Sequence, residues 1–213
     1  MAAAGYLVTL RLLSSKRVVL FMEKLNTKEL STQDRILSAA KQCFSKQGFH
    51  STSMKHICQT CNLSPGTLYH HFPSKEALIQ AIIFEAQKRA LIRLSEPLNG
   101  MSLIDYIIES TQSLADEDHN ERALVVEIMA EGMRNPQVAE MLKKKYMIIA
   151  ASIIERFNDA QANNEMRQTV NKEISARLLM ALVYGIMSDS QSQEYLRHED
   201  YPATLRNILA GIL

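Results

Sequence analysis

One short segment, CNLSPGTLYHHFPSKEAL from Cys61 to Leu78, constrains the fold because it places several residues that disfavour helices between two stretches of helical pattern. Ser64 is a strong N-cap residue, and Pro65 suits the first position of a helix, where its missing N–H is not needed. Pro73 ends a helix at the preceding residue, and Ser74 can cap the next helix. The segment therefore predicts a helix of about two turns that is bounded at both ends.

A second short helix is predicted directly before this one. Its apolar stripe starts near Ser51 or Thr52 and stops at Asn62, a residue that tolerates a left-handed backbone. In the helix after the tight turn, Leu68 and Phe72 face one side at a spacing of four residues. The polar groups of that helix lie on or near the other side: Thr67, Tyr69, His70 and His71, the last of which we expect to be structural, like Phe72. Two helices joined by a tight turn, the second exposing hydrogen-bonding groups, form a helix-turn-helix unit.

Apolar residues at spacings of three and four predict longer helices in the rest of the chain. We expect them over residues 31–48, 74–95, 102–116, 120–134, 136–162, 171–190 and 202–213. The sequence contains no strand alternation and no internal repeat, so the predicted fold is all-α: an N-terminal three-helix helix-turn-helix domain followed by a helical bundle. The helix over 171–190 is largely apolar, which indicates burial on several sides or a subunit interface.

The chain of 213 residues has a net charge of +1, but its charge is unevenly distributed. Residues 28–93 contain nine Lys and Arg against four Asp and Glu, a balance of +5, and they hold four of the six histidines. Residues 101–170 contain seven basic against twelve acidic residues, a balance of −5. A basic module joined to an acidic one predicts a polyanionic partner, double-stranded DNA, for the first module only.

Composition and the N-terminal segment exclude several classes of protein. Three cysteines in a chain of this length do not form a disulfide framework, which favours a reducing compartment and a cytoplasmic protein. The first 21 residues are apolar, but Arg11, Lys16 and Arg17 interrupt them, so no membrane span is predicted, and no small-residue cleavage site marks a signal peptide. Met22 opens a polar stretch, and the residues before it are either an extension from a wrongly assigned start codon or a disordered tail.

The residues from Asp34 to Leu78 resemble the DNA-binding domain of TetR/AcrR-type transcriptional regulators. The family pattern has an apolar helix ending in Phe-x-x-x-Gly, a Thr at the second helix, and a turn that leads into Gly-Thr-Leu-Tyr-x-His-Phe and then Ser-Lys-Glu. The matching residues are Phe44, Gly48, Thr52, Ile57, Ser64, Gly66, Thr67, Leu68, Tyr69, His71, Phe72, Ser74, Lys75, Glu76 and Leu78. The sequence departs mildly from the pattern at Asn62, where the family has a glycine, and at Leu63, where it has a valine.

The resemblance implies three parts: an N-terminal extension over residues 1–27, a helix-turn-helix DNA-binding domain over 28–76, and a ligand-binding and dimerisation domain over 77–213. It also implies a homodimer formed through the last two helices. A two-fold dimer presents two reading helices, so its operator is expected to be palindromic. The implied function is repression, relieved when a small apolar or amphipathic effector enters the C-terminal domain and shifts the helix that starts at Ser74.

The predicted DNA-binding residues are Thr52, Ser64, Pro65, Thr67, Tyr69, His70 and Lys75. Thr67 and His70 are expected to reach base edges, and the other hydroxyl-bearing and basic residues among them are expected to contact phosphate oxygens. Thr52 and Lys75 each lie at the start of a helix, and helix N-termini favour anions.

The predicted ligand-pocket residues are Phe84, Tyr106, Glu127, Met129, Met133, Met147 and Tyr184. Eleven methionines are a high count for this chain, and most of them lie in its C-terminal part. Flexible thioethers suit a pocket that accepts varied apolar ligands, and they equally suit an ordinary helical core, so both interpretations stay open. The basic run from Lys143 to Lys145 is expected to be a solvated helix face.

No catalytic residue, cofactor or metal site is predicted. Cys58 and Cys61 lie near His56 but lack a second pair of ligands, so we expect buried small side chains there. Glu127 and Glu131 could act as acid–base groups or as counter-ions for a cationic ligand, but a solvated helix face is favoured. Two alternatives remain to a ligand-responsive regulator: a DNA-binding architectural or cell-cycle protein without a small ligand, and an all-helical enzyme that uses Glu127 and Glu131.

Overall fold

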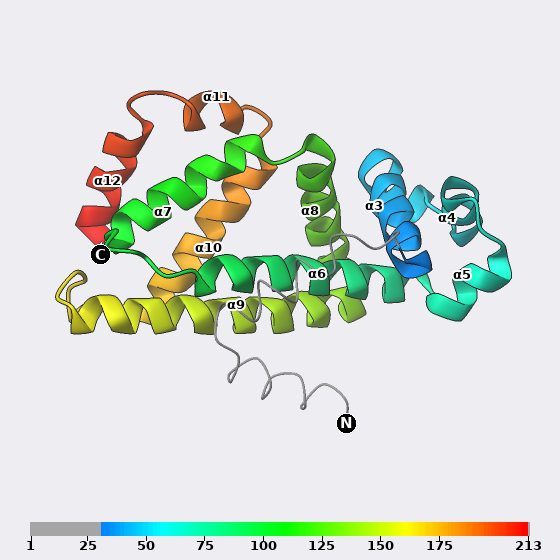
Figure 1. The fold of residues 1–213 in the computed structure, drawn as a ribbon, viewed down its shortest axis with the longest axis horizontal. Coiled ribbons are helices and arrows are strands. Elements are labelled where there is room, and N and C mark those ends of the chain that lie inside the picture. The colour runs from blue at the N-terminus through cyan, green and yellow to red at the C-terminus, as the bar shows by residue number, and fades with distance from the viewer. Residues whose placement is uncertain (1–30, 213) are drawn as a thin grey trace. The chain divides into compact units, whose positions relative to one another are not determined.

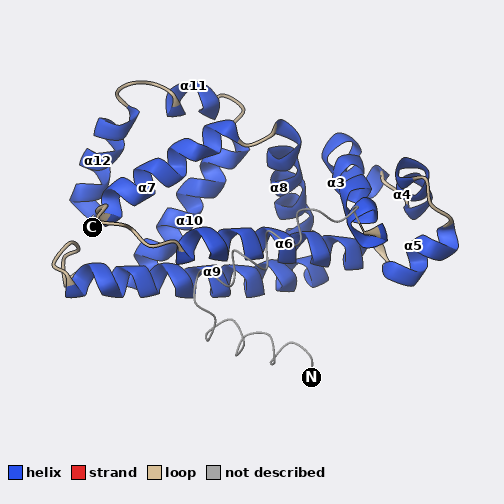
Figure 2. Ribbon diagram, viewed as in Figure 1, coloured by secondary structure: helices blue, strands red, loops and turns tan. Residues whose placement is uncertain are grey.

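The computed structural model describes residues 31–212, and every regular element among them is a helix (Figures 1 and 2). The chain divides into two compact units, Met1–Arg35 and Ile36–Leu213. Apart from the cap that starts the first helix, the features below belong to the second unit. The predicted N-terminal extension over residues 1–27 and the start at Met22 lie outside the described residues.

The elements follow one another as separate helices with short connections. They are α3 (Thr32–Ser51), α4 (Met54–Cys61), α5 (Pro65–His71), α6 (Lys75–Ser95), α7 (Leu103–Gln112), the 3-10 turn η1 (Ser113–Asp116), α8 (His119–Gly132), α9 (Pro136–Ala162), α10 (Lys172–Ser188), α11 (Ser192–Leu196) and α12 (Tyr201–Ile212). The all-α prediction is confirmed. Helix α11 was not predicted, because five residues are too short to show a helical period.

Side chains cap the N-termini of several helices at the positions that the sequence predicts. Ser31 and Asp34 form a reciprocal pair at the start of α3, in which each accepts a hydrogen bond from the backbone N–H of the other at 3.1 Å. The side chains of Ser64, Ser74 and Asn135 accept hydrogen bonds from the first turns of α5, α6 and α9. Each cap satisfies backbone donors that the helix itself leaves unpaired.

The junction between α3 and α4 differs from the prediction by two residues. Gly48 breaks the helical geometry with φ 79° and ψ 164°, a conformation that favours glycine. The cap of α4 is Ser53, whose side chain accepts from the N–H of His56, rather than Ser51 or Thr52. Thr52 is not available as a cap, because its hydroxyl donates inward to the carbonyl of Gly48 at 2.8 Å.

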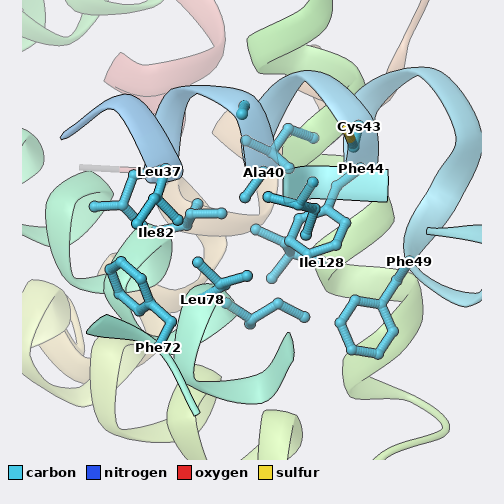
Figure 3. Close-up of a cluster of buried hydrophobic side chains, with 14 of the residues drawn as sticks. Leu37, Ala40, Cys43, Phe44, Phe49, Phe72, Leu78, Ile82 and Ile128 are labelled. Atoms are coloured by element: carbon cyan, nitrogen blue, oxygen red, sulfur yellow. The ribbon is translucent and has the colours of Figure 1, made fainter. Parts of the chain in front are cut away.

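One apolar cluster, which we call the head core, joins the three N-terminal helices to the C-terminal part of the chain (Figure 3). Phe44 of α3 and Leu78 of α6 lie in the same group as Ile128 of α8. Leu142 of α9 belongs to it as well. The boundary between residues 76 and 77 stays a prediction, and apolar packing is continuous across it.

A second cluster fills the space between α7, α9, α10 and α12. Its buried members are Leu103, Ile107, Ile108, Ile149, Ile153, Phe157, Ala160, Met166, Ala176, Met180, Leu205 and Leu209. The long helices α6 and α9 lie side by side, so that α6 runs from the head core into the C-terminal bundle (Figure 1). Helices α6 and α9 therefore both connect the two apolar clusters.

Arginines from distant parts of the chain bind the carbonyl ends of several helices. Arg122 of α8 is buried and donates to Ile186 O and Ser192 Oγ at 3.0 and 2.5 Å, and also to Asp189 O, beyond the end of α10. Arg156 donates to the carbonyls at the end of α6, and Arg167 to those at the end of α12. These contacts satisfy carbonyls that lack helical partners and place positive charge at the negative end of each helix.

Gly48 provides a direct test of the α3–α4 junction. A Cβ at this residue would meet Glu127 Oε1 at 3.2 Å, in a left-handed conformation that alanine disfavours. We expect Gly48→Ala to destabilise the protein by about 1–2 kcal/mol, which lowers the melting temperature by roughly 2–8 °C.

Gly66→Ala is the control, because Gly66 lies in a helix and its nearest neighbour would be 3.8 Å away. Thermal unfolding of both variants would check the prediction. A melting temperature of Gly48→Ala equal to that of Gly66→Ala would contradict it.

Candidate functional site

The turn between α4 and α5 closes as a helix C-cap. Asn62 adopts the left-handed conformation that the sequence predicts, with φ 52° and ψ 49°. The N–H groups of Asn62 and Leu63 donate to Gln59 O and Cys58 O at 3.3 and 3.1 Å. Ser64 then starts α5 by accepting from the N–H of Thr67. The two short helices therefore form a helix-turn-helix whose turn is closed by backbone hydrogen bonds and by the cap of α5.

Helix α5 rests on two apolar anchors. Leu68 is fully buried and Phe72, directly after the helix, is nearly so, and both belong to the head core. The other side of α5 is open, and Tyr69 exposes 52% of its surface. His70 and Pro65 are also exposed, and Thr67 is half-buried with its hydroxyl 2.9 Å from Ser64 Oγ. The predicted amphipathic arrangement of this helix is confirmed.

The outward face of α5 contains no Lys or Arg, so its polar groups are hydroxyls, a phenol and imidazoles. His71 was expected to be structural, but it is exposed and its ring lies against that of His70, with ring centroids 5.4 Å apart. The seven-residue helix ends at His71, so only Phe72 turns inward. The two imidazoles form one exposed surface.

Two of the predicted phosphate-binding side chains are directed into the protein. Thr52 is 1% exposed and its hydroxyl donates to backbone carbonyls, so a phosphate contact by this side chain does not fit the structure. Lys75 donates from Nζ to Phe49 O at 2.8 Å and lies 4.3 Å from the centre of the Phe49 ring. Both residues match a helix start in the sequence, but the tertiary structure uses them to hold the α3–α4 junction.

A cavity of about 30 Å³ lies between α6, α8, α9 and α10. Its walls are Ile82, Ile83, Ala86 and Arg89 of α6; Glu121, Leu124, Val125, Ile128 and Met129 of α8; Leu142, Lys145 and Tyr146 of α9; and Tyr184 of α10. This volume holds about one or two water molecules. Any larger molecule must push the surrounding helices apart to enter.

Lys145 of α9 is a buried charged group in the wall of this cavity. It is 8% exposed, so the expectation that the run from Lys143 to Lys145 is solvated is wrong for this residue. Burial, with a smaller contribution from nearby Arg89, lowers the pKa of Lys145 to about 8. Within residues 31–212, no carboxylate forms an ion pair with it. The ammonium group lies 5.7 Å from the centre of the Tyr184 ring, so its printed contact is with an aromatic face and not with a carboxylate counter-ion.

The helical periodicity of the sequence indicates that Lys145 is buried. Position 145 falls on the buried stripe of α9, three residues after Leu142 and four before Ile149. A basic residue at a core position of an amphipathic helix indicates either a buried ion pair or a ligand site. The neighbouring lysines at 143 and 144 are exposed and conceal that position.

Two tyrosines complete the polar part of the cavity. The rings of Tyr146 and Tyr184 meet edge to face, with centroids 5.3 Å apart. Burial raises the pKa of both hydroxyls, so they stay protonated and can donate hydrogen bonds. Arg89 and Glu121 form an ion pair of 3.2 Å in the same wall and are partly exposed. The cavity thus combines one unpaired cation with neutral donors and apolar surface.

Of the predicted pocket residues, Met129 and Tyr184 line this cavity. Phe84, Met133 and Met147 do not, because their side chains are exposed on the outer faces of α6, α8 and α9, with Met133 91% exposed. Tyr106 is bound elsewhere, donating to Arg93 O at 3.0 Å. Composition shows which residues are apolar but not which face of a helix is covered, so these four residues, predicted for a ligand pocket, are absent from the wall of this cavity.

Glu127 and Glu131 form neither a solvated face nor a shared cleft. Glu127 Oε1 accepts a hydrogen bond of 2.6 Å from the N–H of Phe49. Glu131 is 2% exposed, and its Oε2 lies 3.4 Å from His50 Nε2. Both carboxylates are therefore directed to the junction between α3 and α4, and the favoured sequence interpretation is corrected.

Cys43, Cys58 and Cys61 are buried and form no disulfide within residues 31–212, and burial is what the sequence predicts for Cys58 and Cys61. Among residues 31–212, no group of three or more His, Cys, Asp or Glu side chains is placed to hold a metal ion. In the same part of the chain, none of the helices combines the length and apolarity that crossing a bilayer requires.

Two family profiles match the chain, one over the helix-turn-helix and one over the C-terminal helices. A family profile described as "Bacterial regulatory proteins, tetR family" matches residues 36–82. A second profile, described as "BetI-type transcriptional repressor, C-terminal", matches residues 103–213. Together they cover the helix-turn-helix and the helices from α7 to the end of the chain.

Individual relatives match along almost their whole length. The HTH-type transcriptional regulator UidR of Escherichia coli (strain K12) is 50% identical over 192 residues, which cover 90% of this chain and 98% of UidR. The solved structure of Salmonella enterica GusR is 61% identical, with a TM-score of 0.84 over 88% of this chain and 97% of that one. The fatty acid degradation regulator FadR from Bacillus halodurans is 15% identical, with a TM-score of 0.71 over 88% of this chain and 98% of that one; this likeness concerns the fold alone.

Lys145 makes stability depend on pH in a defined window. Its pKa in the folded protein, about 8, lies below the ordinary value of 10.5, so between these pH values the unfolded chain binds more protons and stability rises with pH. Below pH 8 the full cost of the buried charge is present. We expect Lys145→Met to raise stability at pH 7 by up to about 3 kcal/mol, and this gain to vanish toward pH 10.5.

Urea unfolding at pH 7 and pH 10 would measure this difference. Lys144→Met is the matched control, because Lys144 is exposed and pairs with Glu140 on the same helix. A gain for Lys145→Met that is the same at both pH values would show that the lysine is not a buried, unpaired cation.

Proposed function

Since the chain belongs to the TetR family of bacterial transcriptional regulators, we propose that it is a repressor that binds a palindromic operator as a homodimer and is released by a small amphipathic anion. The observation that carries the DNA part is the exposed face of α5, which is anchored by Leu68 and Phe72 on its other side. The proposed place of action is the cytoplasm, where bacterial DNA lies.

The proposed contacts with DNA are made by the exposed side of α5. His70 and Thr67 read base edges in the major groove, and Tyr69, Ser64 and Pro65 lie against the backbone. The proposal no longer includes the side chains of Thr52 and Lys75, because both are directed inward. The imidazole of His71, exposed next to His70, is a candidate that the sequence did not single out.

The proposed homodimer uses α10 and α12. Ile174, Leu178 and Leu182 are exposed at a spacing of four residues and form an apolar stripe along α10. Ile208 of α12 is exposed as well. Exposed apolar residues in a row are typical of a protein interface, and a second copy of the chain supplies the same stripe by two-fold symmetry. Two copies of α5 would then face major grooves about 34–36 Å apart.

The proposed effector site is the cavity around Lys145. A buried cation without a counter-ion is costly, and a bound anion compensates it more fully than water does. The hydroxyls of Tyr146 and Tyr184 can donate to the same anion, and the apolar walls suit an apolar body. Ile82 and Ile83 line the cavity and also belong to the head core, so α6 extends from the effector site to the reading helices.

The alternatives are not favoured by any described feature. An architectural protein without a ligand leaves the uncompensated Lys145 without a role. An enzyme based on Glu127 and Glu131 needs these carboxylates together in a cleft, whereas each is bound to the α3–α4 junction. The relatives with high identity are transcriptional regulators rather than enzymes.

His70 tests the reading helix. We expect His70→Ala to weaken binding to the DNA that flanks the gene of this protein by at least about 25-fold, since a good base contact contributes roughly 1–3 kcal/mol at each of two half-sites. Tyr69→Phe removes a backbone contact and should weaken binding to all sequences alike. Titrations by fluorescence anisotropy would measure both.

Gln80→Ala, an exposed change on α6, is the control. An affinity of His70→Ala within twofold of the wild type would remove this residue from the reading surface. A wild-type protein without salt-sensitive affinity for this DNA would overturn the proposed function.

Matched pairs of anions and neutral analogues test the effector class. We expect benzoate and octanoate to raise the melting temperature and to weaken operator binding, and benzamide and octanamide to have much smaller effects, because only the anions compensate Lys145. Thermal shift and anisotropy assays measure the two effects. In Lys145→Met the difference between each acid and its amide should disappear; equal responses of the wild type to acids and amides would contradict an anionic effector.

A further inference from the structure

The junction between α3 and α4 is held by side chains from two other helices. Phe49 donates its N–H to Glu127 Oε1 of α8 at 2.6 Å, and its carbonyl accepts from Lys75 Nζ of α6 at 2.8 Å. The Phe49 ring is buried in the head core and lies 4.3 Å below the same ammonium group. Both backbone polar groups of one residue are therefore bound by charged groups, which form stronger hydrogen bonds than neutral partners do.

A second carboxylate of α8 lies beside the first. Glu131 is 2% exposed, and its Oε2 has no hydrogen-bond partner among the described residues. The nearest basic side chains are the imidazole of His50 at 3.4 Å and the guanidinium group of Arg134 at 3.7 Å. A buried carboxylate with incomplete pairing lowers stability, so packing alone does not explain two carboxylates at this junction.

The same helix forms a wall of the effector cavity. Helix α8 has 14 residues, and Val125 and Met129 line the cavity while Glu127 and Glu131 contact the junction. Ile128 lines the cavity and also belongs to the head core. A movement of α8 by a small amount thus changes the cavity and the junction together.

The size of the cavity makes such a movement necessary. A volume of about 30 Å³ is too small for an organic effector, so binding must displace side chains of the wall or the helices that carry them. Helix α8 is the shortest of the cavity helices, with 14 residues against 21 in α6 and 27 in α9. Because α8 also contacts the α3–α4 junction through Glu127, its displacement would change that contact.

We propose that Glu127 is a positioning residue through which α8 sets the orientation of the DNA-reading helices. Its hydrogen bond to Phe49 holds the α3–α4 junction, and an effector that displaces α8 loosens this hold. The inference rests on the proposed function, since it requires operator binding and an occupied cavity. The cavity is thus coupled to the reading helices through α8 as well as through α6. The coupling through α8 depends on the carboxylate of Glu127, which in this proposal touches neither DNA nor effector.

Three single variants test the positioning role. Glu127→Ala removes the acceptor, Glu127→Gln keeps a neutral acceptor, and Glu140→Ala removes an exposed carboxylate of α9 as the control. We expect Glu127→Ala to weaken operator binding at least fivefold, Glu127→Gln to lie between it and the wild type, and the control to stay within twofold. The slope of log Kd against log salt concentration should not change, because no phosphate contact is lost.

Amide hydrogen exchange of Phe49 reports the contact directly. In Glu127→Ala this amide should exchange at least tenfold faster than in the wild type, while its rate in Glu140→Ala stays unchanged. A mere loss of stability would lower the melting temperature without making Glu127→Gln and Glu127→Ala differ in operator affinity. Dimer mass and melting temperature of each variant complete the measurement.

A change in the cavity wall tests the coupling without a known effector. Val125→Phe places a larger side chain of α8 in the small cavity. It should weaken operator binding at least fivefold in the wild-type background. In the Glu127→Ala background it should weaken binding by less than twofold, since the hold is already lost. This double-mutant cycle isolates the coupling between the two positions.

The outcomes separate this inference from the proposed function. If the wild type binds its operator but Glu127→Ala binds within twofold of it, the positioning role is wrong and the proposed function stands. The same holds if Val125→Phe has equal effects in both backgrounds. If the wild type does not bind the operator at all, the proposed function fails and the inference fails with it.

Discussion

The head core is the packing arrangement on which the other features depend. Leu68 and Phe72 fix the reading helix by burying themselves in a cluster to which α6, α8 and α9 also contribute. The helix-turn-helix has too few apolar residues to form a separate core of any size, so it shares one with the C-terminal bundle. For this reason a change in the bundle reaches the reading helix through packed side chains and not through a flexible linker.

The buried charged groups of the described residues differ in how completely they are paired. Lys145 is buried without a counter-ion, and Glu131 has a carboxylate oxygen without a hydrogen bond. By contrast, the buried Arg122 is fully bound by carbonyls and a hydroxyl. The paired charge of Arg122 is thus explained by structure, and the incompletely paired charges are the ones for which we propose a functional role. A protein selected only for stability would replace Lys145 with an apolar residue.

The local structure of the head could be predicted to within a few residues, because it depends on short-range chemistry. Ser64, Asn62 and Ser74 define helix ends through their own side chains or backbone conformations, and these preferences are visible in the sequence. The effector cavity could not be predicted in this way. Met133 and Met147 have the expected composition but lie on outer faces, whereas Lys145 lies inside. Which face of each helix is covered depends on its neighbours.

The sequence by itself determined the all-helical class, the short capped helix from Pro65 to His71, and the family of the chain, since local caps, helical periods and motif residues are properties of contiguous segments. Only the tertiary structure decided that Thr52 and Lys75 turn inward, that Glu127 binds Phe49, and that Lys145 stands unpaired in a cavity. These facts join residues up to 78 positions apart in the chain. Distant partners leave no local pattern, because contact between them depends on the packing of every helix that lies between.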